Sequence, residues 1–101
     1  MIKFTPRQKQ IIDNLAGALQ KEAGDMTDTV AKGIIQLGLD EACRELGIEL
    51  SSVQERDKAG RLAFNNLLLD KIAIRLRRLY MPDERIEAIR GRLQKVYEKI
   101  M

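Results

Sequence analysis

The sequence predicts a mainly α-helical protein that begins with one short strand. Through most of the 101 residues, apolar side chains recur at steps of three and four, which is the spacing of one face of an α-helix. The strict alternation of apolar and polar residues that favours a strand is found at residues 2–5. Gly and Pro interrupt the helical pattern and divide it into four predicted helices. We therefore expect two domains, residues 1–50 with the strand and two helices, and residues 51–101 with two more helices.

The predicted strand needs a partner from a second chain. Ile2 and Phe4 alternate with Lys3 and Thr5, so one face of the strand is apolar and the other is polar. A single strand leaves its backbone N–H and C=O groups and its apolar face unpaired. The simplest completion is a two-stranded ribbon shared by two copies of the chain, with Lys3 and Thr5 on its open face. The N-terminal half is therefore expected to form a homodimer.

Local signals set the ends of the first helix. Thr5 suits the N-cap and Pro6 the first helical position, which predicts a helix over residues 6–22. Gly24 can take the positive φ that ends it. This helix should bury the apolar face that repeats at three- and four-residue steps.

A second helix is predicted over residues 28–46. Thr27-Asp28-Thr29 provides its entry and Gly47 its end. Its apolar arc is broad, which indicates burial on more than one side. The interior glycines, Gly33 and Gly38, either permit a close helix crossing or are tolerated at the surface.

The C-terminal half is predicted to be an antiparallel helical hairpin. Ser52 and Glu55 have the spacing of a capping box that opens a helix over residues 52–80. Tyr80-Met81-Pro82 is short enough only to reverse the chain, and Pro82 begins the fourth helix. Two helices do not enclose a core, so we expect this half to associate with partner chains as part of a homodimer or homotetramer.

The residues expected at that oligomer interface form an apolar seam along the two helices. They are Leu62, Asn65, Leu69, Ile72, Leu76, Leu79, Ile86, Ile89, Leu93 and Val96. Asn65 is the polar member of the seam. It either fixes the register or the number of chains, as polar seam residues do in coiled coils, or lies at an exposed position.

Composition argues against an enzyme and against a metal or cofactor. The chain has no His, one Cys and no Trp, and its seven Gly form no phosphate-binding cluster. Cys43 is expected to be a small apolar filler. The absence of a signal-peptide pattern, a transmembrane run and a disulfide framework favours a cytoplasmic protein that neither enters a membrane nor acts on a small-molecule substrate.

Charge is distributed unevenly along the chain. The net charge is +3, but residues 1–24 carry +2, residues 25–55 carry −5 and residues 56–101 carry +6. The last segment holds twelve basic and six acidic side chains. This asymmetry predicts an electrostatic partner for the C-terminal half.

Two resemblances to known families follow from the order of these elements. The strand, the Pro at the first helix start, the Gly turn and the hydroxyl-bearing entry to the second helix resemble ribbon-helix-helix repressors. The segment Ile34-Ile35-Gln36-Leu37-Gly38-Leu39 and the later segment Phe64-Asn65-Asn66-Leu67-Leu68-Leu69-Asp70 resemble the TraM conjugation proteins of F-like plasmids. The resemblance implies a relaxosome accessory protein that binds DNA near an origin of transfer through its ribbon. It also implies tetramerisation through the C-terminal helices, which receive the acidic tail of a coupling-protein ATPase.

The residues expected to contact double-stranded DNA lie near the N-terminus. Lys3 and Thr5 on the ribbon face are expected to contact base edges. Arg7 is expected to offset the repulsion of DNA by Asp25 and Asp28. Thr27 and Thr29 stand where free backbone N–H groups of the second helix can hold a phosphate. The alternatives are an ordinary solvated strand face for the first residues and simple helix capping for the two threonines.

Arg75, Arg77 and Arg78 are the candidate partner-binding cluster. They either form a groove that grips the carboxylates of an acidic tail or belong to a solvated helix face. The favoured function is sequence-specific DNA binding by an oligomeric, ribbon-helix-helix protein in plasmid conjugation or transcription regulation. The alternatives are an antitoxin-type or partition repressor, and a helical protein–protein interaction module with no DNA role.

Overall fold

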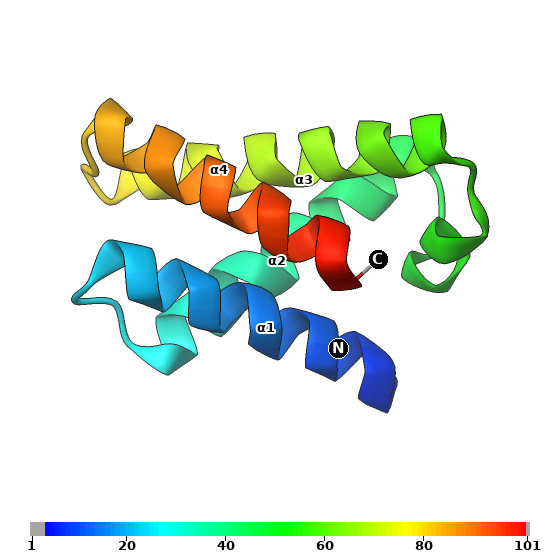
Figure 1. Ribbon diagram of the computed structural model, residues 1–101, viewed down its shortest axis with the longest axis horizontal. Coiled ribbons are helices and arrows are strands. Elements are labelled where there is room, and N and C mark those ends of the chain that lie inside the picture. Colours follow the sequence, from blue (N-terminus) through cyan, green and yellow to red (C-terminus); the bar gives the residue numbers. More distant parts are fainter. Residues whose placement is uncertain (1–3, 101) are drawn as a thin grey trace.

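The computed structural model describes residues 4–100 and is built from four α-helices and one short 3-10 helix. The elements are α1 (Pro6–Ala23), α2 (Asp28–Leu46), η1 (Leu50–Glu55), α3 (Lys58–Arg78) and α4 (Asp83–Ile100). Each helix packs on its neighbour in the chain, and α4 returns to lie against α1 (Figure 1). In this view α1 and α4 form the nearer layer, with α2 and α3 behind them.

The predicted ends of the first two helices are confirmed. The Thr5 hydroxyl accepts a hydrogen bond from the backbone N–H of Gln8 at 3.2 Å, and the Gln8 side chain accepts one from the backbone N–H of Thr5 at 2.9 Å. The backbone at Gly24 has φ 84° and that at Gly47 has φ 65°, so both helices end at residues without a Cβ. These signals act within one turn of each helix end, so the helices begin and end close to the predicted positions.

The start of α3 differs from the prediction. Residues 50–55 form η1, and the Ser52 hydroxyl donates to the carbonyl oxygen of Glu49 at 2.8 Å and so does not cap a following helix. Val53 is buried, which holds η1 against the core. The cap of α3 is Asp57, whose carboxylate accepts from the backbone N–H of Gly60 at 2.8 Å.

The described residues contain no strand, which corrects the prediction for Phe4 and Thr5. Thr5 is the N-cap of α1, and Phe4 packs against the core of its own chain. Ile2 and Lys3 lie outside the described residues. Residues 4 and 5, the second half of the segment that was expected to form a ribbon, therefore lead into α1 and do not form a strand.

The antiparallel pairing of α3 and α4 is confirmed, but the chain supplies its own remaining helices for the core. One hydrophobic cluster draws on α1, α2, η1, α3 and α4. Seven of the ten seam residues are buried within it: Asn65, Leu69, Ile72, Leu76, Ile86, Ile89 and Leu93. Leu62 and Leu79 are exposed, and Val96 is partly buried. Partner chains are not needed to close this core, because α1 and α2 cover the hairpin.

The two glycines in α2 have different roles. A Cβ added at Gly38 would lie 3.2 Å from side-chain atoms of Ile72 and of Leu68, so Gly38 permits the close approach of α2 and α3. A Cβ added at Gly33 would meet nothing within 4 Å. The close-crossing interpretation therefore applies to Gly38 and the tolerated-glycine interpretation to Gly33.

Candidate functional site

One side of α1 carries a polar stripe that faces solvent. Arg7, Gln10, Asn14, Gly17 and Lys21 follow one another at steps of three and four, so they share one side of the helix. All five are exposed. The opposite side of α1 carries the apolar residues that enter the core, which fixes the orientation of the stripe.

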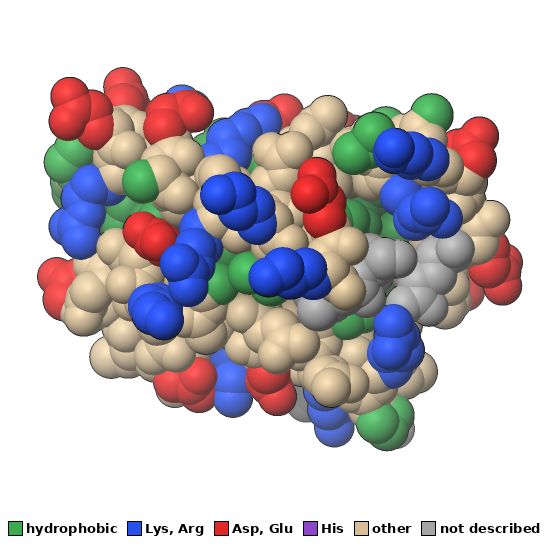
Figure 2. All heavy atoms as spheres, viewed as in Figure 1, with side chains coloured by type: hydrophobic (Ala, Val, Ile, Leu, Met, Phe, Trp, Pro, Cys, Tyr) green, Lys and Arg blue, Asp and Glu red, His purple; other side chains and the backbone are tan. Residues whose placement is uncertain are grey.

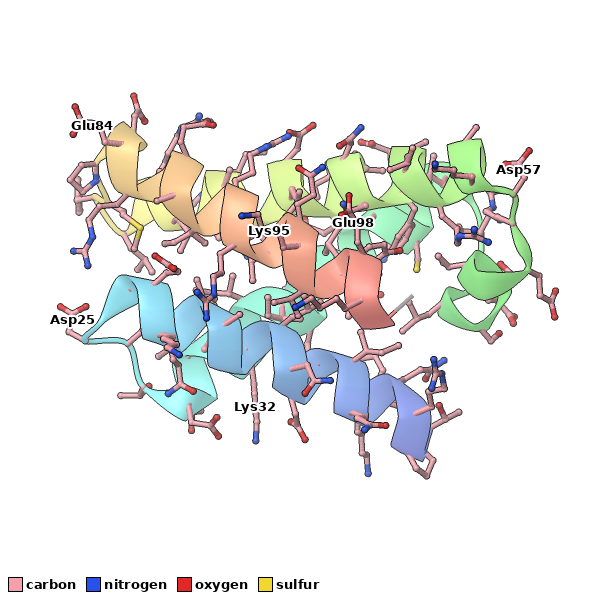
Figure 3. All side chains as sticks on the ribbon, viewed as in Figure 1. Asp25, Lys32, Asp57, Glu84, Lys95 and Glu98 are labelled. Carbon is pink, nitrogen blue, oxygen red and sulfur yellow. The ribbon has the colours of Figure 1, made fainter. Side chains whose placement is uncertain are left out.

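A second stripe with the same spacing runs along α4. It consists of Arg85, Ala88, Arg92, Lys95 and Lys99. Its glutamates, Glu84, Glu87 and Glu98, are exposed on the adjoining side of the helix, and Glu98 follows Lys95 by three residues. Figure 3 shows Glu84 projecting from the start of α4 away from α1. The basic and acidic side chains of α4 therefore lie on adjoining sides of the helix.

The two stripes lie side by side because α1 and α4 are antiparallel neighbours (Figure 1). At one end, the Arg85 guanidinium donates to the carbonyl oxygen of Ala23 at 2.7 Å, and Arg92 lies 3.6 Å from the Glu22 carboxylate. At the other end, Lys99 lines a hollow of about 190 Å³ together with residues of the α1 stripe. We call the ten residues of the two stripes the basic face.

The basic face carries six Arg and Lys residues and no Asp or Glu. Lys21, Lys95 and Lys99 have no ion-pair partner among residues 4–100. Figure 2 shows Lys and Arg side chains gathered over α4 and along its border with α1. Lys95, labelled in Figure 3, stands on this side of the molecule. The arrangement gathers positive charge, of which Lys21, Lys95 and Lys99 form no ion pair within the described residues.

Several ion pairs elsewhere join neighbouring helices. Arg75 pairs with Glu41 of α2, Lys71 pairs with Glu45 at 3.1 Å, and Lys32 of α2 lies 3.5 Å from Asp13 of α1. Lys32 also pairs with Asp28 at 3.0 Å, and the hydrogen bond that the Lys32 ammonium donates to Asp28 is the largest cause that raises its pKa. These charges hold neighbouring helices together and are not available as a group to a partner.

The candidate partner-binding arginines do not form one groove. Arg75 points to Glu41 of α2, whereas Arg77 lies 3.5 Å from Asp83 at the start of α4. Arg78 is exposed at the end of α3. The three side chains therefore have different surroundings: Arg75 pairs within the helical bundle, Arg77 pairs across the turn, and Arg78 faces solvent.

The candidate DNA contacts of the N-terminal half are also separated. The hydroxyls of Thr5 and Thr27 cap α1 and α2, and Thr27 accepts from the backbone N–H of Val30 at 3.2 Å. Arg7 belongs to the basic face, while exposed Thr29 lies beyond the other end of α1. The 18 residues of α1 extend about 27 Å, so one chain does not bring these groups together. Lys3 lies outside the described residues.

The α4 stripe lies outside the residues that were predicted to bind DNA or a partner. The basic surplus of the C-terminal half pointed to it, and the seven-residue repeat of Arg85, Arg92 and Lys99 was a readable signal. What the sequence did not reveal was the packing of α4 on α1, which joins the two stripes into one surface.

A separate groove of about 680 Å³ lies between the start of α1 and the end of α2. Its apolar lining includes Phe4, Leu39, Cys43, Ile48 and Leu50. Burial raises the pKa of the Cys43 thiol, and the nearby Asp40 adds to the shift. Cys43 is half-buried and packs against the core, as expected of an apolar filler. The raised pKa favours the protonated thiol over the thiolate.

Comparison of the chain with protein-family models, curated proteins and solved structures finds no match. Among residues 4–100, no group of three His, Cys, Asp or Glu side chains is arranged to hold a metal ion. Over the same residues, no helix combines the length and apolarity that a membrane span requires. The basic face is the candidate site because it gathers six Arg and Lys side chains on two adjacent helices.

Proposed function

We propose that the protein binds double-stranded DNA through the basic face. The observation that carries the proposal is the pairing of two basic stripes, from helices at opposite ends of the described chain, with no carboxylate at any of their ten positions. A surface of this kind attracts a polyanion and releases its condensed counterions on contact. The basic face fits this role better than any other cluster of charges among residues 4–100.

The dimensions of the face support a nucleic-acid partner. From Arg7 to Lys21, and from Arg85 to Lys99, each stripe extends about 21 Å along its helix axis. The charges are spread over two helices, which suits a row of phosphates better than the convergent grip that a short acidic peptide needs. The arginines that were expected to provide such a grip, Arg75 and Arg77, are paired within the chain.

The test measures the affinity for a duplex of about 20 base pairs, roughly two helical turns, by fluorescence anisotropy. The variant Lys21→Gln/Lys95→Gln/Lys99→Gln removes three charges from the basic face. We expect it to reduce the slope of log affinity against log salt by about 0.9 for each lysine that contacts a phosphate. Weaker binding at a given salt concentration follows from the same loss.

The matched control is Lys9→Gln/Lys58→Gln/Arg78→Gln, which removes the same net charge from exposed positions outside the basic face. Equal losses in the two variants would mean that net charge alone governs binding, and this would refute the basic face as the site. If the unchanged protein shows no duplex binding at about 50 mM salt, the DNA-binding proposal itself is wrong. A helical protein–protein interaction module would then be the better interpretation.

A homodimer or homotetramer and a role in conjugation remain part of the proposal and rest on the resemblance to TraM proteins. Light scattering gives the oligomeric state directly. Lys3→Ala tests the predicted base contact of that residue, because the substitution should alter base preference only if Lys3 contacts DNA.

A further inference from the structure

We infer that α1 is the element that reads bases, entering the DNA major groove with Gln10 and Asn14 toward the base edges. This inference rests on the proposed function and deepens it. The two amides are exposed, stand one helical turn apart and lie between the basic residues Arg7 and Lys21. They are the only carboxamides in the two stripes of the basic face.

The chemistry of an amide side chain suits this position. Asn and Gln present a donor and an acceptor side by side, which matches the N6 and N7 atoms of adenine in the major groove. One helical turn from Gln10 to Asn14 rises about 6 Å, close to two base-pair steps of about 3.4 Å. A single α-helix fits within the major groove, which is about 12 Å wide.

The α4 stripe is suited to the phosphates. It contains only Arg, Lys and Ala, and it lies beside α1 along the length of the pair. Lys99 lines the hollow that Gln10 and Asn14 also line, so a positive charge stands directly beside the amides. Arg85 binds the last carbonyl groups of α1, which ties the two helices together at the opposite end.

The surroundings of α1 also favour its approach to DNA. A Cβ added at Gly17 would meet nothing within 4 Å, so packing in this chain does not require a glycine there. Its lack of a side chain leaves the centre of the stripe low between Asn14 and Lys21. The nearby carboxylate of Asp13 lies 3.5 Å from the Lys32 ammonium, which offsets its charge toward phosphates.

The experiment selects binding sites for the full chain from a library of duplexes with random sequence. We expect the unchanged protein to enrich a motif that contains adenine, and Gln10→Ala/Asn14→Ala to lose preference at two positions of that motif. The loss should be roughly 5- to 150-fold for each base pair read by an amide, with unselected duplex bound as before. The control, Gln36→Ala/Asn66→Ala, removes two exposed amides outside the basic face and should retain the motif.

A second pair of variants tests the approach of α1. Gly17→Leu places a side chain at the centre of the face, and Gly91→Leu places one on α4 outside it; neither Cβ would meet an atom within 4 Å. Both variants should fold, but Gly17→Leu should reduce the affinity for the selected site to that for unselected duplex, whereas Gly91→Leu should not.

The outcomes separate this inference from the proposed function. Absence of duplex binding by the unchanged protein overturns both. Duplex binding without sequence preference, or a preference that survives Gln10→Ala/Asn14→Ala, overturns the base-reading role of α1 and leaves DNA binding by the basic face intact. Equal binding of duplex RNA also overturns it, since the narrow major groove of A-form RNA does not admit a helix.

Discussion

Replacing Asn65 by Leu should stabilise the protein. The Asn65 side chain is 1% exposed and lies in the hydrophobic core on α3. Neither its Oδ1 nor its Nδ2 has a hydrogen-bond partner among the residues that the structure describes. Burial of an amide without partners costs free energy, because the group gives up its hydrogen bonds to water and gains none in return.

The magnitude follows from this environment. An unsatisfied buried polar group lowers the free energy of unfolding by about 1–3 kcal/mol relative to a well-packed apolar side chain at the same position. Leucine has the same number of side-chain heavy atoms as asparagine, so the space at Asn65 accepts it with little repacking. We expect the free energy of unfolding to rise by about 1–3 kcal/mol, with the melting temperature rising roughly 4–8 °C for each kcal/mol.

The assay is urea unfolding followed by circular dichroism, with Asn66→Leu as the matched control. Asn66 is the exposed neighbour on the same helix, and its substitution should change the free energy of unfolding by less than about 0.5 kcal/mol. A loss of more than about 1 kcal/mol in Asn65→Leu alone would refute the reasoning, since it would mean that the amide is bonded in solution. A change of molecular mass in light scattering would instead support the role of Asn65 in setting the number of chains.

Two further predictions concern helix packing and alkaline pH. In urea unfolding, Gly33→Ala should stabilise the protein by about 0.5–1 kcal/mol, because alanine has the higher helix propensity. Gly38→Leu should destabilise it by about 1–3 kcal/mol, because the new side chain overpacks against α3. A stabilising Gly38→Leu together with a destabilising Gly33→Ala would contradict the packing of α2. Burial raises the pKa of the Tyr97 phenol to about 12, above its ordinary value of 10.0. The folded state therefore binds the phenolic proton more tightly than the unfolded state, and this contribution is complete below pH 10 and lost as the pH rises toward 12. The difference between the wild type and Tyr97→Phe, measured by urea unfolding across this range, should show the loss only in the wild type; parallel curves would contradict it.

The sequence predicted helix limits well where the signal is local. Thr5, Gly24, Thr27 and Gly47 act through their own backbone or their nearest turn, so their roles can be read without knowing the fold. Ser52 shows the limit of this approach. Its position relative to Glu55 predicted a helix cap. In the structure the segment forms η1 with Val53 buried, and Asp57 caps α3 instead.

The choice of packing partners was not readable in the same way. The seam on α3 and α4 indicated correctly that Ile72, Leu76 and Leu93 are buried, but an apolar seam does not state which chain covers it. The same limit applies to the candidate site. Each basic stripe is visible in the spacing of its residues, whereas their union depends on α4 packing against α1, a contact between segments about sixty residues apart.

Charge is distributed unevenly around α4. Its basic stripe borders α1, and Glu84, Glu87 and Glu98 lie on the adjoining exposed side. For the proposed binding of DNA, this uneven distribution favours encounters in which the basic face approaches first. This orienting force acts within the Debye length, about 10 Å at 0.1 M salt. The arrangement of α4 thus bears on the rate at which a complex forms as well as on its strength.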